Sequence, residues 1–297
     1  MSELYEEFLD HDVISRLSRL TVLPRGLVEG SFTGMHRSPH RGSSVEFAEY
    51  RKYVQGDDIR NIDWRIFAKT DRYYIKEFEA DTNMRLFLVI DCSASMNFES
   101  EYGTKFNYAR KMAATLAHLT INQGDQVGMQ CFNTDIVEDL PPMTSPAHLK
   151  AIMETMKGMT PKGETDLIDV LHKLAEKYSR RSLVLIFSDF FCDLEPLMEC
   201  FQHMRFRKHD VAAFHLLDPL ELSFNFDRPI RFVDLEGNST VITEPSNTKN
   251  NYMTALHDYL KLIKKGCQEQ GTDYNMVDIS KSFESILSSF MLERMRK

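Results

Sequence analysis

Cysteines and long apolar runs are both scarce in this sequence. The five cysteines are an odd number without closely spaced pairs, which indicates reduced thiols and argues against a disulfide framework or a zinc site. No apolar stretch approaches the roughly 20 residues that a membrane-spanning helix needs. The acidic stretch 1–12 lacks the apolar core of a signal peptide. The sequence therefore predicts a cytoplasmic protein without a membrane span.

Positive charge is also in short supply. The net charge of the 297 residues is −8, so a broad basic surface for nucleic acid is not expected. With 42% hydrophobic and 27% charged residues, the composition is that of a globular protein with a sizeable core.

The glycine-rich and nucleophilic motifs of several large enzyme classes are missing as well. No Gly-x-Gly-x-x-Gly turn follows the first expected strand, and no Gly-x-Ser-x-Gly elbow is present. Glu164 stands where a P-loop would need its lysine, and Ser93 stands where a haloacid-dehalogenase-type enzyme would need its second aspartate. These absences favour a protein that is not an enzyme.

From about residue 84 the chain alternates between apolar strands and amphipathic helices. The runs 86–91 and 181–187 are apolar on both faces, which is typical of parallel strands covered on both sides. The pattern predicts further strands near 126–132, 136–140, 210–217 and 273–279, helices near 104–122, 146–157, 167–179, 194–206, 246–269 and 281–295, and a hairpin over 229–243. The predicted fold class is therefore α/β, with a doubly wound, mostly parallel sheet over residues 84–297.

Residues 1–83 differ from the rest of the chain in composition and pattern. A helical pattern covers 2–20, and the stretch 25–80 is rich in glycine and charge. Because its aromatic side chains need burial, we expect this extension to pack on the sheet domain, with Trp64 as a packing anchor. The predicted division of the chain is 1–83 and 84–297.

Small oxygen-bearing side chains gather where the predicted strands end. Asp91, Ser93 and Ser95 follow the first strand at alternate positions, so they share one direction on extended backbone. Asp189 follows the strand 181–187, and Thr165 lies in the loop before a helix. Ligands of doubly wound sheets bind at this edge, and oxygen donors suit Mg²⁺. Each residue alone is equally typical of a helix cap or a turn.

These residues resemble the metal-ion-dependent adhesion site of von Willebrand factor A domains. The resemblance implies that Ser93, Ser95 and Thr165 bind Mg²⁺ directly, while Asp91 and Asp189 act mostly through water. It further implies an open coordination position for an acidic residue of a partner. Where the family usually has Gly-Gly-Thr-Asp, this chain has Glu164 before Thr165, which adds a carboxylate beside the site.

A longer resemblance is to the MoxR-associated family known as domain of unknown function 58. It is carried by the segments 34–42, Glu46-Phe47, Tyr50–Tyr53, Gly56–Trp64 and Asp91–Met96. The resemblance implies a bacterial von Willebrand A-like protein that works with a MoxR-type AAA+ ATPase. Many members of the family have membrane helices, and none is predicted here.

The sequence therefore predicts a non-enzymatic, metal-dependent protein–protein interaction module. It would be an adaptor or assembly factor for a MoxR-type ATPase or for another protein that presents an acidic residue. The expected cofactor is Mg²⁺, with Mn²⁺ and Ca²⁺ open because both accept oxygen ligands. Two alternatives stay open: a scaffold with a vestigial metal site that docks through residues 30–80, and a metal-dependent hydrolase.

Overall fold

The computed structural model describes residues 2–25, 46–52, 63–70, 72–79, 84–226, 230–233, 235, 240–243 and 245–295. Its contacts divide the chain into two compact units, one made of residues 1–25 and 85–297 and the other of residues 26–84. Residues 2–25 are thus grouped with the sheet domain and not with the extension that follows them. Most of the family motifs of the extension, in 26–45 and 53–62, lie outside the described residues.

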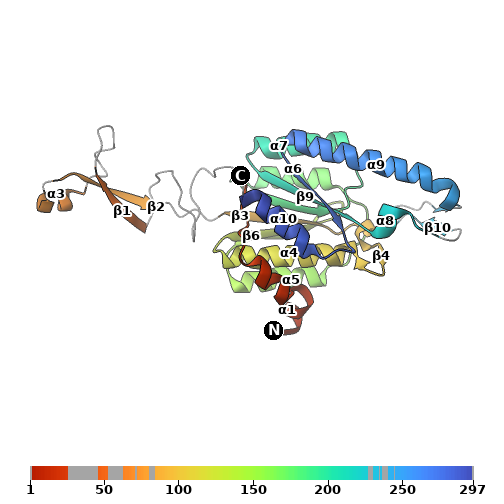
Figure 1. Ribbon diagram of the computed structural model, residues 1–297, viewed down its shortest axis with the longest axis horizontal. Coiled ribbons are helices and arrows are strands. Elements are labelled where there is room, and N and C mark those ends of the chain that lie inside the picture. The colour runs from red at the N-terminus through yellow and green to blue at the C-terminus, as the bar shows by residue number, and fades with distance from the viewer. Residues whose placement is uncertain are drawn as a thin grey trace. The chain divides into compact units, whose positions relative to one another are not determined.

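A six-stranded sheet forms the centre of the larger unit (Figure 1). Its order is β12 (Asp273–Asp278), β9 (Asp210–Leu217), β8 (Leu183–Ser188), β3 (Arg85–Asp91), β6 (Gln126–Phe132) and β7 (Ile136–Met143). All neighbours are parallel except β6 and β7, which are antiparallel. After β3 the chain adds β6 and β7 on one side of it, and then β8, β9 and β12 on the other side. The topological switch point therefore lies between β3 and β8.

Helices cover both faces of this sheet. Figure 1 shows α6 (Leu167–Lys177), α7 (Leu194–Phe206) and α9 (Pro245–Gln270) on one face and α4 (Lys105–Asn122), α5 (Pro146–Gly158) and α10 (Phe283–Met295) on the other. The predicted doubly wound α/β fold is confirmed. The strands β3 and β8 are buried along almost their whole length, as continuous apolar runs between two helix layers must be.

The predicted helical stretch 2–20 is two short helices, α1 (Ser2–Phe8) and α2 (His11–Leu17). The break lies at Asp10, whose carboxylate accepts hydrogen bonds from the backbone N–H groups of Asp12 (2.9 Å) and Val13 (3.2 Å). Aspartate is a strong N-cap because its side chain satisfies free N–H groups of a helix start. The local cap therefore overrides the continuous periodicity.

Several small elements were not predicted. They are the 3₁₀ turn η2 (Ala94–Asn97), the paired β4 (Glu99–Ser100) and β5 (Gly103–Thr104), and α8 (Pro219–Ser223). The predicted hairpin is confirmed in its strands, β10 (Ile230–Val233) and β11 (Thr240–Thr243), while its turn lies outside the described residues.

The amino ends of β9 and β12 are tied to α10 by a buried charge cluster. Arg294 Nη1 bonds to Asp210 Oδ2 (2.7 Å) and to the carbonyl oxygen of Leu23 (2.9 Å), and its Nη2 lies 2.6 Å from Asp273 Oδ2. Arg25 also pairs with Asp273. Two guanidinium groups thus face two carboxylates, so the charge of this cluster is balanced.

In the smaller unit β1 (Glu46–Lys52) pairs with β2 (Tyr74–Glu79) in antiparallel fashion, and α3 (Trp64–Thr70) lies between them in the chain. Within this unit Trp64 does not act as a packing anchor. Its side chain is 60% exposed, and it meets Phe67 edge-on at 6.1 Å between ring centroids. The better-packed ring is that of Phe67, which stacks on Tyr73 at 4.5 Å.

Candidate metal site

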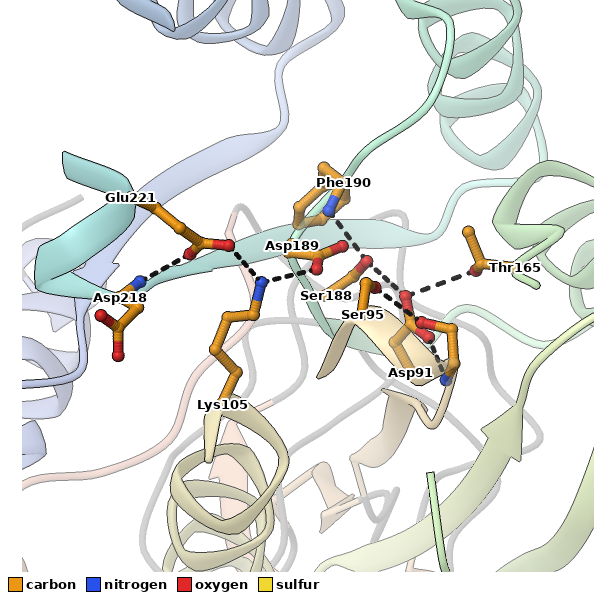
Figure 2. A network of polar contacts seen from close by, with 10 residues as sticks. Asp91, Ser95, Lys105, Thr165, Ser188, Asp189, Phe190, Asp218 and Glu221 are labelled. Atoms are coloured by element: carbon orange, nitrogen blue, oxygen red, sulfur yellow. Dashed lines mark hydrogen bonds and ion pairs between the residues drawn. The ribbon is translucent and has the colours of Figure 1, made fainter. Parts of the chain in front are cut away.

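The candidate residues meet at the carboxyl ends of β3 and β8, the two strands on either side of the switch point (Figure 2). Asp91 is the last residue of β3 and Ser188 the last of β8. Because the strands are parallel neighbours, the loops that follow them leave the sheet at one edge. That placement brings Asp189 to the same edge as Asp91 and the serines after it.

Asp91 lies at the centre of the cluster and is fully buried. Its Oδ2 accepts a hydrogen bond from Ser188 Oγ (2.6 Å) and another from Thr165 Oγ1 (3.4 Å). Its Oδ1 accepts the backbone N–H of Ser93 (2.9 Å). The hydroxyl oxygens of Ser93 and Ser95 are 3.0 Å apart. The structure therefore brings the three predicted segments together, while their role as metal ligands stays a prediction.

The loop that carries Thr165 is held against the loop after β3 by backbone hydrogen bonds. The N–H of Lys162 donates to the carbonyl of Cys92, and the N–H of Ala94 donates to the carbonyl of Gly163, both at 2.9 Å. Gly163 has a φ of +79°, a left-handed conformation that glycine adopts without steric cost. These contacts explain how Thr165 reaches Asp91 from a position far along the chain.

Helix capping does not account for the hydroxyl side chains of the cluster. The cap of α6 is Asp166, whose carboxylate accepts the N–H of Asp169 at 3.1 Å. Ser93 precedes η2 but makes no side-chain capping bond. Thr165 directs its hydroxyl to Asp91 and not to the helix backbone. The turn interpretation does hold for Ser188, whose Oγ accepts the N–H of Phe190 (3.0 Å).

A buried lysine that was not predicted adjoins the cluster. Lys105, 1% exposed, donates from Nζ to Asp189 Oδ2 and to Glu221 Oε1, each at 2.8 Å (Figure 2). The second oxygen of Glu221 accepts the N–H of Asp218 (2.7 Å). Asp189 Oδ1 is buried and has no hydrogen-bond partner among the described residues.

Negative charge is in excess in this connected network. Among the described residues it holds four carboxylates (Asp91, Asp189, Asp218 and Glu221) and one ammonium group, that of Lys105, which contacts Asp189 and Glu221. Burial, and then the charge of Asp189, raise the pKa of Asp91 to about 7, and burial raises the pKa of Glu221. Burial alone would lower the pKa of Lys105, but Asp189 and Glu221 raise it overall. A bound cation would offset this excess.

The donor set fits a hard divalent cation. It consists of hydroxyl and carboxylate oxygens, the ligands that Mg²⁺ accepts while keeping several waters. Within the described residues no group of three or more His, Cys, Asp or Glu side chains could hold a metal ion. A site here would therefore depend on the hydroxyls of Ser93, Ser95 and Thr165. Glu164 is exposed, whereas Thr165 beside it is half-buried.

Cys92, between Asp91 and Ser93, is buried. Its Sγ donates to the carbonyl of Phe132 at 2.9 Å, and burial raises the pKa of its thiol to about 12. Lys105 and Glu221 were not predicted as members of the network. The one available signal was a lysine directly after the N-cap Thr104, at a helix end where a positive charge is unfavourable.

His215, on β9 beside this network, makes the stability of the protein depend on pH. Burial lowers the pKa of His215 to about 4, although Asp189 opposes that shift. An unfolded imidazole has a pKa near ~6.5, so between about pH 6.5 and pH 4 the unfolded state gains a proton that the folded state does not. Acidification over this range should therefore cost up to ~3 kcal/mol of stability.

Asp91 has the opposite effect on stability: because its pKa is raised in the folded state, acidification stabilises the protein through this group. The contribution of His215 is therefore obtained from the difference between the wild type and a variant that lacks it. The measurement is urea unfolding of the wild type and of His215→Phe in EDTA from pH 7.5 to pH 4. The stability of the wild type relative to the variant should decline as the pH falls. Parallel curves would show that His215 does not titrate in this way.

The fold and site described above are those of a doubly wound α/β domain with a cluster of oxygen donors at its switch point. Residues 49–259 match the family described as "Protein of unknown function DUF58". The chain belongs to this family.

Relatives with similar sequences include uncharacterized proteins of Mycobacterium tuberculosis and Mycobacterium bovis. Each is 28% identical to this chain over 218 residues, which cover 72% of this chain and 68% of the relative.

Similar solved structures include three proteins of low identity to this chain. The conserved hypothetical protein BatB of Bacteroides thetaiotaomicron is 15% identical with a TM-score of 0.49, covering 72% of this chain and 100% of that one. An aerotolerance-related membrane protein of Bacteroides fragilis is 18% identical with a TM-score of 0.48, covering 71% and 100%. The VWA domain of SpRpn10 is 10% identical with a TM-score of 0.43, covering 70% and 95%. Because these scores are low, we infer function from the geometry of this chain.

The cytoplasmic location predicted from the sequence is corrected by these comparisons. The similar protein of Bacteroides fragilis is described as a membrane protein, so a cytoplasmic location is not retained. That description applies to the Bacteroides protein. Among the described residues of this chain, every helix is too short or too polar to cross a membrane.

Proposed function

We propose that this protein is a metal-dependent protein–protein interaction module without catalytic activity. A divalent cation, Mg²⁺ by preference, would be held by the hydroxyls of Ser93, Ser95 and Thr165. The carboxylates of Asp91 and Asp189 would balance its charge, mainly through water. A carboxylate of the partner protein would complete the coordination when the two proteins bind.

The observation that supports this proposal most directly is the distance between the hydroxyl oxygens of Ser93 and Ser95. They lie 3.0 Å apart. Adjacent oxygen ligands of an octahedral Mg²⁺ ion, each at ~2.1 Å from the metal, are separated by about 3.0 Å. The two hydroxyls are thus already spaced as a pair of neighbouring ligands.

The charge of the surrounding network supports the same proposal. The buried cluster at the amino ends of β9 and β12 has equal numbers of guanidinium and carboxylate groups. The cluster at the carboxyl ends has four carboxylates and one ammonium group. Buried charges are usually paired, so a site with this imbalance favours a cation.

The partner proposed here is a protein with an accessible Asp or Glu, and a MoxR-type AAA+ ATPase is the first candidate. This choice depends on the resemblance of the sequence segments to the MoxR-associated family. Neutral hydroxyl ligands leave most of the charge of a divalent cation unscreened, so a carboxylate of the partner would be attracted to it.

One contact favours a second candidate function, that of a scaffold with a vestigial metal site. Lys105 already supplies one positive charge to Asp189 at 2.8 Å. If that charge sufficed, the protein would bind partners without metal, through residues 30–80. Charge reversal at Arg37 and Arg41 would then abolish binding while EDTA would have no effect.

The experiment that tests the proposed function is capture of partners from native cells by the tagged protein in Mg²⁺ and in EDTA. The proposal expects a specific partner that is retained in Mg²⁺, released by EDTA and lost when its own acidic residue is replaced by the amide. A partner retained equally in EDTA would favour the scaffold. Turnover in a phosphatase or nuclease screen with Mg²⁺ or Mn²⁺ would contradict the absence of catalysis.

A further inference from the structure

Lys105 occupies a position that is costly for a lysine. It is the first residue of α4, directly after the N-cap Thr104, where the helix dipole is unfavourable for a positive charge. Its side chain is also almost completely buried, and taking an ammonium group out of water costs several kcal/mol unless it is well paired. Two carboxylates, Asp189 and Glu221, provide that pairing.

The bond to Asp189 fixes how this carboxylate is presented. Lys105 Nζ donates a hydrogen bond to Asp189 Oδ2 at 2.8 Å. Asp189 Oδ1 is buried and has no hydrogen-bond partner among the described residues. Residues that hydrogen-bond to metal-binding groups orient those groups and tune the affinity for the metal. Lys105 is therefore placed to leave one oxygen of Asp189 free for a cation or its bound water.

The bond to Glu221 extends the network to α8. Glu221 accepts Lys105 Nζ with Oε1 and the N–H of Asp218 with Oε2, while Asp218 accepts the N–H of Leu220 at 2.8 Å. Asp218 and Glu221 thus form the capping box that begins α8, and Lys105 bonds to the Glu221 member of it. Tyr252 of α9 donates to the backbone carbonyl of Glu221 at 2.9 Å. One ammonium group thus joins the edge of the sheet to the start of α8, as Figure 2 shows.

From this geometry we infer that Lys105 is a positioning residue that orients Asp189 for the cation and couples cation binding to α8. The inference rests on the proposed function. A divalent cation near Asp189 repels the ammonium group and shares the charge of that carboxylate. The ammonium group is then drawn toward Glu221 and fixes that side chain in place, so the bond from the N–H of Asp218 to Glu221 opens less often. By linkage, the closed form of the α8 start binds the cation more tightly than the open form, by the same factor by which the cation favours the closed form.

The first test replaces Lys105 by methionine and measures Mg²⁺ affinity by isothermal titration calorimetry. Charge alone predicts tighter binding, because K105M removes a positive charge from the neighbourhood of the cation. The positioning role predicts the reverse, with a dissociation constant roughly 10–100 times higher. The matched control is K111M, which removes an exposed lysine from the same helix and should leave the affinity unchanged.

The second test uses the wild-type protein, so that it does not depend on the folding of K105M. Amide hydrogen exchange at Asp218 and Leu220 is measured with and without saturating Mg²⁺. Coupling predicts that exchange at these two amides is slower in Mg²⁺ by a factor of at least about five. The effect should vanish in E221Q, in which the amide –NH₂ cannot accept both hydrogen bonds, although this variant still binds Mg²⁺.

The outcomes separate the inference from the proposed function. If the wild type binds Mg²⁺ but K105M binds it equally or more tightly, the positioning role is wrong and the proposed function stands. If the wild type binds Mg²⁺ and exchange at Asp218 and Leu220 is unchanged, the coupling to α8 is wrong. If the wild type binds no Mg²⁺, both fail together.

Discussion

Replacement of Ser93 and Ser95 together by alanine is expected to abolish Mg²⁺ binding and leave the fold intact. The double variant removes two of the three proposed direct ligands. Changes in residues that only support metal ligands already cost 10–100-fold in affinity, so the loss here should exceed about 100-fold. Because the two hydroxyls bond to each other at 3.0 Å, the variant removes both members of that hydrogen bond, which is close to neutral for stability.

Titration calorimetry with Mg²⁺ measures this loss, and urea unfolding in EDTA checks the fold. A suitable control is S285A/S288A, which removes two hydroxyls far along the chain from the candidate site. The hydroxyl of Ser285 donates to the backbone carbonyl of Ser282, and that of Ser288 donates to the backbone carbonyl of Ser285. The control should bind Mg²⁺ like the wild type. Unchanged affinity in S93A/S95A would show that the cation, if any, lies elsewhere.

Replacement of Arg294 by methionine is expected to lower the free energy of unfolding by about 3–5 kcal/mol, the usual cost of removing one partner from a buried ion pair. Arg294 contacts two buried carboxylates, those of Asp210 and Asp273, at 2.7 and 2.6 Å. It also donates to the carbonyl of Leu23. Methionine keeps most of the apolar volume, so the loss reflects charge and hydrogen bonding more than packing.

Urea unfolding of R294M in EDTA measures this effect. The matched control is R207M, since Arg207 is exposed and surface changes are usually within about 0.5 kcal/mol. Folded R294M should bind Mg²⁺ with wild-type affinity, because Asp210 and Asp273 begin their strands whereas the candidate site lies where strands end. A loss below about 1 kcal/mol would mean that water compensates the two aspartates.

The sheet was predictable because its strands carry unambiguous local signals. The apolar run at 86–91 and the run at 181–187 match β3 and β8 to within two residues, and the strands 126–132 and 210–217 match without error. Buried parallel strands must be apolar on both faces, so their pattern is fixed by burial alone. The N-terminal helix was less predictable, because one cap at Asp10 divides it.

The candidate site was predictable only where its residues follow strands directly. Asp91, Ser93 and Asp189 lie within two residues of a strand end, so the topology alone places them at one edge. Lys105 and Glu221 could not be found in this way, because their pairing joins positions 116 residues apart. The exposure of Trp64 was not predicted because the prediction used only its residue type. Tryptophan is usually buried, but the residue type does not show which side chains surround a given position.

The most direct test of the central claim is a crystal structure of the protein grown with Mn²⁺, with anomalous data collected for the metal. The account predicts one anomalous peak that both Ser93 Oγ and Ser95 Oγ contact directly, at a distance near the ~2.1 Å that hard cations of this size adopt. Asp189 should still accept Lys105 through Oδ2, with its other oxygen turned toward the metal or its water. An empty site in which the ammonium group of Lys105 alone neutralises the cluster would contradict it.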